Sequence, residues 1–178
     1  GVDVGRTLRA ASAQLRHGEH AAALEAIRSV LAECQDQPDA LHLLGLWQHE
    51  QGDSPAAVTS IRAAIAAWPA DDPVLAGAWN NLGNVLVESG QGNDAVEAYR
   101  ASLAVDPANG PTWGNLATLL RRLGRPDEAV IAAERALASA RTPWAIPWPC
   151  VYEFVSVVTH PRIWRDAAST LEEAWLQL

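Results

Sequence analysis

Four glycines recur along the chain at an almost constant spacing. They are Gly18, Gly52, Gly90 and Gly124, and the intervals between them are 34, 38 and 34 residues. In every unit an alanine follows the glycine by five positions and an apolar residue follows it by thirteen. Such a period is typical of stacked units that bury their apolar faces only against one another. It therefore predicts an elongated repeat protein.

Each unit has the pattern of two helices. Apolar residues at helical spacing precede the third glycine, namely Trp79, Leu82, Val85 and Leu86. Gly90 is placed to end that helix, because glycine adopts the left-handed conformation without strain. We expect the second helix of this unit to begin with Asn93 or Asp94 as its N-cap and to end before Pro107.

Composition supports an all-α fold and narrows the function. The 178 residues include 34 alanines, and alanine is the strongest helix former. The net charge is −8 and every basic residue is arginine, so the clustered basic surface of a nucleic-acid-binding protein is not expected. The two cysteines, Cys34 and Cys150, suggest no disulfide framework and favour a reducing, cytoplasmic setting.

Several other classes of protein are disfavoured by what the sequence lacks. It has no apolar run long enough to span a membrane and no leader pattern, so no membrane partner is expected. The five histidines have no metal-ligand spacing, and no hydrolase or phosphate-loop motif is present, so no cofactor or metal site is predicted. Because the chain starts with Gly and has no Met, we expect it to be a piece of a longer protein.

The repeats resemble the tetratricopeptide family. The resemblance is carried by the 34-residue period, the W-x2-L-G pattern at Trp79, Leu82 and Gly83, the glycine-to-alanine spacing, and the prolines that close two units. It covers residues 4–141 and implies a right-handed superhelix of four helix-turn-helix repeats. We expect the repeats at about 4–37, 38–75, 76–109 and 110–141.

In this family the first helix of each pair lines a concave groove that holds an extended peptide. Carried over by position, the resemblance assigns the following candidate peptide-binding residues: His42, His49, Asn80, Asn81, Asn84, Asn115, Thr118, Arg121 and Arg122. The equivalent positions of the first repeat are Leu8, Arg9, Ser12 and Arg16, and those of the second also include Leu43, Leu46 and Glu50.

Asparagine suits such a groove, because its amide offers both a donor and an acceptor to a peptide backbone. Asn81 and Asn115 occupy the same position in successive repeats, which is similar to the asparagine ladder in the repeat region of O-linked N-acetylglucosamine transferases. Leu43 and Arg9 interrupt this pattern in the earlier repeats. The alternative is that the two asparagines only satisfy the backbones of neighbouring loops. Arg121 and Arg122 would attract an acidic ligand or form a solvated surface.

The tail, residues 142–178, lacks the period and resembles a fragment of a PIN-domain ribonuclease of the VapC-like toxin type. The resemblance is carried by "PWAIPWPCVYEFVSVVTHPRIW" followed by "STLEEAW", and it would make Glu153 a metal ligand. One carboxylate cannot hold a catalytic metal alone, so we expect no enzyme activity. We expect a linker followed by one or two helices. A docked cap, a disordered tail, a dimer contact and a fusion remain alternatives.

Three functions follow from these patterns. The first is a non-enzymatic scaffold that binds a partner peptide or protein of unknown identity in the repeat groove. The second is a remnant or part of a metal-dependent ribonuclease toxin fused to repeats. The third is the substrate-presenting region of a larger bacterial enzyme, such as a glycosyltransferase. The sequence leaves the partner and the oligomeric state open.

Overall fold

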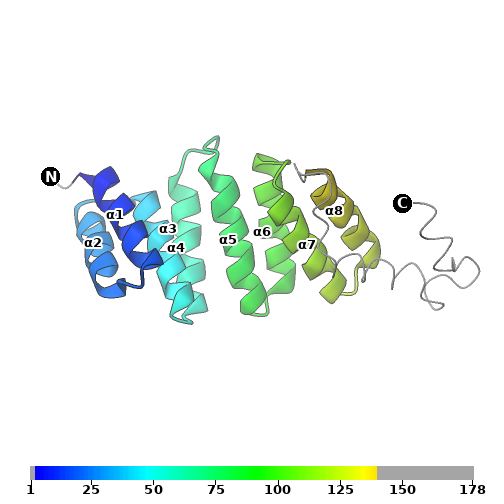
Figure 1. Cartoon of the computed structure of the whole chain (residues 1–178), viewed down its shortest axis with the longest axis horizontal. Helices are drawn as coiled ribbons and strands as arrows, with labels where there is room; N and C mark the ends of the chain where they lie inside the picture. Colours follow the sequence, from blue (N-terminus) through cyan, green and yellow to red (C-terminus); the bar gives the residue numbers. More distant parts are fainter. Residues whose placement is uncertain (1–2, 140–178) are drawn as a thin grey trace, which may run out of the picture. The chain divides into compact units, whose positions relative to one another are not determined.

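A computed structural model describes residues 3–139, which form eight α-helices and no strand (Figure 1). The helices are α1 (Val4–Arg16), α2 (His20–Glu33), α3 (Pro38–Glu50), α4 (Ser54–Ala67), α5 (Val74–Glu88), α6 (Gly92–Val105), α7 (Gly110–Arg122) and α8 (Pro126–Ser139). The prediction of an all-α repeat fold is confirmed for this part of the chain.

The helices are arranged as four pairs that follow one another along the chain. Within each pair the two helices pack together, and the second helix of a pair also packs against the first helix of the next. In addition, α1 contacts α3 and α3 contacts α5. The helices α1, α3 and α5 therefore follow one another side by side, and hydrogen bonds from Asn115 join α7 to α5.

The four repeated glycines end the first helices as predicted. All have positive φ, from 71° at Gly124 to 80° at Gly52. In each turn the residue after the glycine donates its backbone N–H to a carbonyl five residues earlier, as Gln91 does to Leu86 at 2.9 Å. This turn leads straight into the next helix. The expected N-cap at Asn93 or Asp94 is therefore wrong, because α6 already begins at Gly92, after Gln91.

Small residues allow close approach within each pair. Ala95 and Ala129 are buried, and Gly83 on α5 lies against the ring of Tyr99 on α6. A Cβ atom at Gly83 would come within 2.5 Å of Tyr99 Cε1. At the equivalent place in the second repeat, a Cβ at Gly45 would come within 2.6 Å of Ile61 Cγ1. The glycines set the distance between the paired helices.

The core is continuous through the later repeats and separate in the first. One buried cluster runs from Ala57 on α4 to Ala132 on α8, whereas a second joins Leu8 and Ile27 to Ala40. On α8 the side chains of Val130, Ile131 and Leu137 are more than half exposed. Among residues 3–139, no helix follows α8 to pack on these side chains.

The predictions for the tail lie outside the described residues. They concern the linker and helices of 142–178 and the metal-ligand role of Glu153. Among the described helices, none is both long enough and apolar enough to cross a lipid bilayer.

Candidate functional site

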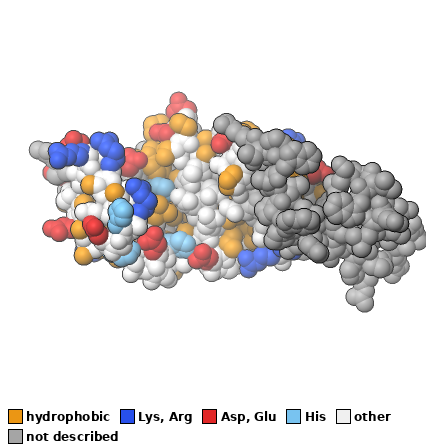
Figure 2. All heavy atoms as spheres, in the orientation of Figure 1, with side chains coloured by type: hydrophobic (Ala, Val, Ile, Leu, Met, Phe, Trp, Pro, Cys, Tyr) orange, Lys and Arg blue, Asp and Glu red, His pale blue; other side chains and the backbone are white. Residues whose placement is uncertain are grey.

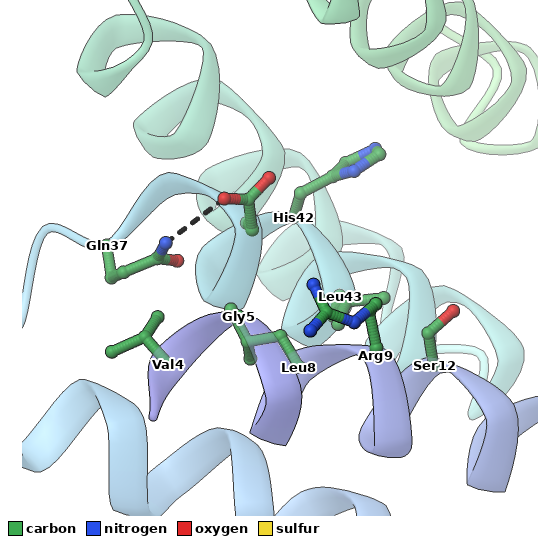
Figure 3. Close-up of a pocket in the computed structure, with 9 residues that line it drawn as sticks. Val4, Gly5, Leu8, Arg9, Ser12, Gln37, His42 and Leu43 are labelled. Carbon is green, nitrogen blue, oxygen red and sulfur yellow. Dashed lines mark hydrogen bonds between the residues drawn. The ribbon is translucent and has the colours of Figure 1, made fainter. Parts of the chain in front are cut away.

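The outward side chains of α1, α3, α5 and α7 form a surface that we name the first-helix face, and it contains two hollows. The first hollow lies between α1 and α3, has a volume of about 460 Å³ and is shown in Figure 3. Its lining comprises Val4, Gly5, Leu8, Arg9, Ser12, Gln37, Asp39, His42 and Leu43. The second hollow, about 340 Å³, is lined by His49, Asn84, Val87, Glu88, Tyr99, Asn115, Thr118, Leu119 and Arg122.

Three asparagines in and beside the second hollow are joined by hydrogen bonds. Asn115 Nδ2 on α7 donates to Asn80 Oδ1 at 3.1 Å and to Asn84 Oδ1 at 3.3 Å, both on α5. The Tyr99 hydroxyl donates to Asn84 Oδ1 at 2.8 Å, and the Thr112 hydroxyl donates to Asn80 Oδ1 at 3.1 Å. These bonds fix the orientation of the amides before any ligand arrives.

The network leaves part of its hydrogen-bonding capacity unused. Asn84 Nδ2 and Asn115 Oδ1 form no hydrogen bond with a described residue, and solvent reaches both atoms. One is a donor and the other an acceptor, and the residues that carry them both line the second hollow. A peptide backbone, which alternates carbonyls and N–H groups, has the complementary chemistry.

The two asparagines at the repeated position do not bond to each other. Asn81 Nδ2 lies 3.1 Å from His42 Nε2, whereas Asn115 bonds to Asn80. His42 and Asn80 occupy equivalent places, because 38 residues separate the second and third repeats. Each asparagine therefore bonds back to the same register position of the preceding repeat. These bonds link side chains of neighbouring first helices.

At the same register in the first two repeats, both residues are leucines. Leu43 takes the place of Asn81, and Leu8 takes the place of His42. Both line the first hollow (Figure 3). Leu8 lines this hollow but is only 6% exposed, because it also belongs to the core of the first repeat. An apolar contact here replaces the polar bridge of the later repeats.

The histidines of α3 differ in their surroundings. Burial lowers the pKa of His42 below its ordinary value, and the Asp39 carboxylate opposes part of that shift. His42 also packs edge-to-face on Trp68, with 5.4 Å between ring centroids. His49 Nε2 lies 3.5 Å from Glu88 Oε1, and its Nδ1 is buried without a partner. Asn81 and Glu88 thus hold both histidines against α5.

The remaining predicted residues lie at the end of α7. Arg122 and Thr118 line the second hollow, whereas Arg121 is exposed and lines neither hollow. The Thr118 hydroxyl donates to the Gly114 carbonyl of its own helix at 2.9 Å. Neither arginine forms an ion pair with a described residue. Arg122 is therefore available to a ligand.

Sequence reasoning missed Tyr99, Thr112 and Ser102, which support the asparagines from behind. The Ser102 hydroxyl is fully buried, donates to the Ala76 carbonyl at 2.7 Å and lies 3.4 Å from Thr112 Oγ1. Burial raises the pKa of the Tyr99 hydroxyl to about 12, with a further contribution from the Glu88 carboxylate, so Tyr99 remains a donor at neutral pH. The available signal was Tyr99 itself, nine residues after its glycine, where the first two repeats have isoleucine.

The arrangement is suited to binding by hydrogen bonds and apolar contact. Within residues 3–139, no group of three or more His, Cys, Asp or Glu side chains is placed to hold a metal ion. The hollows are open, and their polar groups are amides, hydroxyls, guanidinium groups, imidazoles and the carboxylates of Asp39 and Glu88. Such groups recognise an extended polypeptide or another ligand rich in hydrogen-bonding groups.

The comparison with protein families agrees with this geometry. Two family models, both described as tetratricopeptide repeat, match residues 8–72 and 74–142 and together cover most of the chain. The chain belongs to the tetratricopeptide repeat family. No curated protein is similar enough in sequence to count as a match. The tail's resemblance to a PIN-domain ribonuclease receives no support from any comparison.

Solved structures show the same tetratricopeptide fold. A crystal structure of MamA is 23% identical, with a TM-score of 0.68, over 77% of this chain and 78% of that one. Cut9, in a crystal structure of the APC/C hetero-tetramer Cut9-Hcn1, is 20% identical with a TM-score of 0.70. That match covers 78% of this chain but only 27% of the other. At these identities the likeness establishes the fold alone.

Proposed function

We propose that this chain is a non-enzymatic scaffold that holds an extended segment of a partner protein on the first-helix face. A protein-interaction role agrees with the tetratricopeptide fold and with its likeness to MamA and to Cut9 in its hetero-tetramer. The observation that carries the finer proposal is the pair of unused amide groups, Asn84 Nδ2 and Asn115 Oδ1, in the second hollow.

The fixed amides are what makes this site suitable for a peptide backbone. Asn84 and Asn115 are already oriented by Tyr99 and Asn80, so a ligand does not have to order them. Preorganisation of this kind lowers the entropic cost of binding. Asn84 would donate to a backbone carbonyl and Asn115 would accept from a backbone N–H. Binding through backbone groups tolerates many side chains in the partner.

The test is selection of binders from a random library of capped decapeptides, followed by fluorescence-polarisation titration on the full chain. The double variant Asn84→Ala/Asn115→Ala should weaken every selected peptide. A net hydrogen bond is worth about 1 kcal/mol, so losing two corresponds to a rise in Kd of roughly tenfold or more. Asn93→Ala, on the exposed part of α6, is the matched control and should leave Kd unchanged.

Two results would contradict the proposal. Undiminished binding by a double variant that retains wild-type helicity would place the binding site elsewhere. Failure of the wild-type chain to bind any peptide would show that the face does not hold an extended segment.

A further inference from the structure

The first hollow differs chemically from the rest of the first-helix face. Its floor is apolar and contains Leu8 and Leu43. The later repeats have polar pairs at this register, His42 with Asn81 and Asn80 with Asn115. A peptide backbone passing over this floor meets no amide at that register. The floor instead suits a side chain without polar groups, such as Leu, Ile or Val.

A free cation stands beside this floor. Arg9 occupies the same position in the first repeat as Leu43 in the second, and its side chain lines the hollow (Figure 3). It forms no hydrogen bond or ion pair with a described residue through its guanidinium. Arg16, two turns further along the same helix, already donates to the Ser12 hydroxyl at 3.1 Å.

The distribution of charge favours an acidic partner. The whole chain has 13 basic and 21 acidic residues, but the four first helices reverse this balance with five arginines and three acidic residues. Figure 2 shows several arginines around the first repeat, with Asp and Glu side chains between them. The one carboxylate in the first hollow, Asp39, accepts a hydrogen bond from Gln37 at 3.1 Å and lies in the first turn of α3. The positive end of that helix partly offsets its charge.

From these observations we infer that the first hollow binds an aliphatic side chain of the partner protein while Arg9 binds a carboxylate next to it. This inference rests on the proposed function and names the partner's chemistry: an extended segment in which Asp or Glu adjoins Leu, Ile or Val. Arginine recognises carboxylates with charge-assisted hydrogen bonds. The remaining backbone of the segment lies over the asparagines of the later repeats.

The experiment uses the full chain and the same library of capped decapeptides, whose blocked termini exclude recognition of a terminal carboxylate. Selected peptides should be enriched in Asp or Glu adjoining an aliphatic residue. Replacing the Asp or Glu of the peptide by Asn or Gln should raise Kd about tenfold, and so should Arg9→Ala. Combining the two changes should add little further loss of affinity. Arg9→Glu should reverse the preference and favour peptides with Lys at that place.

Three further variants make the inference specific to this hollow. Asp39→Asn should tighten the binding of acidic peptides, because it removes the one opposing charge. Leu43→Asn restores the residue of the later repeats and should abolish the aliphatic preference while leaving helicity unchanged. Arg62→Ala, an exposed arginine on α4, should leave Kd unchanged.

The outcomes separate this inference from the proposed function. Peptides that bind through Asn84 and Asn115 but show no acidic or aliphatic preference would overturn the inference alone. Equal binding of the acidic peptides by Arg9→Glu would overturn it as well. Failure of every peptide to bind the wild-type chain would overturn both.

Discussion

Gly83 is the residue at which a single added atom should disturb the fold most directly. A Cβ there would lie 2.5 Å from the Tyr99 ring, which its hydroxyl bond to Asn84 holds in place. We expect Gly83→Ala to destabilise the chain by about 1–3 kcal/mol, the usual cost of overpacking. Chemical denaturation monitored by circular dichroism measures this loss.

The control for that substitution lies on the same helix. A Cβ at Gly77 would meet nothing within 4 Å. Gly77→Ala should therefore stabilise the chain by about 0.5–1 kcal/mol, because alanine is the better helix former. Equal gains from both variants would show that helix propensity, and not the contact with Tyr99, governs the response of α5.

His42 should make stability depend on pH in one direction. Its pKa is lowered from 6.5 in the folded chain, chiefly by burial. As pH falls, His42 is therefore protonated in the unfolded chain before it is protonated in the folded chain. Its contribution to the free energy of unfolding is complete above pH 6.5 and is lost as pH falls below that value. His42→Gln, which can still accept from Asn81, should lose less stability between pH 7.5 and 5.5 than the wild type. The comparison requires urea denaturation at both pH values.

The exposed His17 provides the reference for this effect. His17→Gln should reproduce the pH dependence of the wild type. If His42→Gln also reproduced it, the buried histidine would not be the titrating group.

Between elements, a buried hydroxyl should matter more than an exposed ion pair. Ser102 on α6 is fully buried and donates to the Ala76 carbonyl of α5. Glu128 on α8 pairs with Arg100 on α6 at 3.0 Å and with Arg125 at 2.7 Å, but these three side chains are 33–45% exposed. Solvent screening leaves such pairs little net effect. We expect Ser102→Ala to cost about 1–2 kcal/mol and Glu128→Gln to leave the Tm unchanged within error. Thermal melts of both variants measure which substitution lowers the Tm more.

The element boundaries were predictable where backbone conformation determined them, and the site was predictable only in part. Glycine has to supply the left-handed turn, so the end of the helix before Gly90 could be predicted from the glycine spacing alone. The hydrogen-bond partners of Asn81 and Asn115 could not be predicted, because the register between neighbouring first helices depends on how the helix pairs stack. The burial of Leu8 could not be predicted for the same reason: it packs into the first core as well as lining the first hollow.

On the scale of the whole molecule, contacts join neighbouring pairs and few others, so stability should be nearly one-dimensional. The first repeat has its own core around Leu8 and Ile27, whereas Leu82 belongs to the core shared by the later repeats. Leu82→Ala should therefore cost about 2–5 kcal/mol and speed amide exchange from α4 to α8. Leu8→Ala should speed exchange in α1, α2 and the part of α3 that shares this core.

Hydrogen exchange measured by mass spectrometry tests this division, because it reports each helix separately. In this chain, α1 and α2 should exchange faster than α5 and α6, since within residues 3–139 the first pair packs against one other pair and the third pair packs against two. Equal acceleration of all eight helices by Leu8→Ala would show that the two cores unfold as one unit. The separate behaviour of the first repeat also bears on binding, because the first hollow would then be formed or lost by folding of α1 against α3.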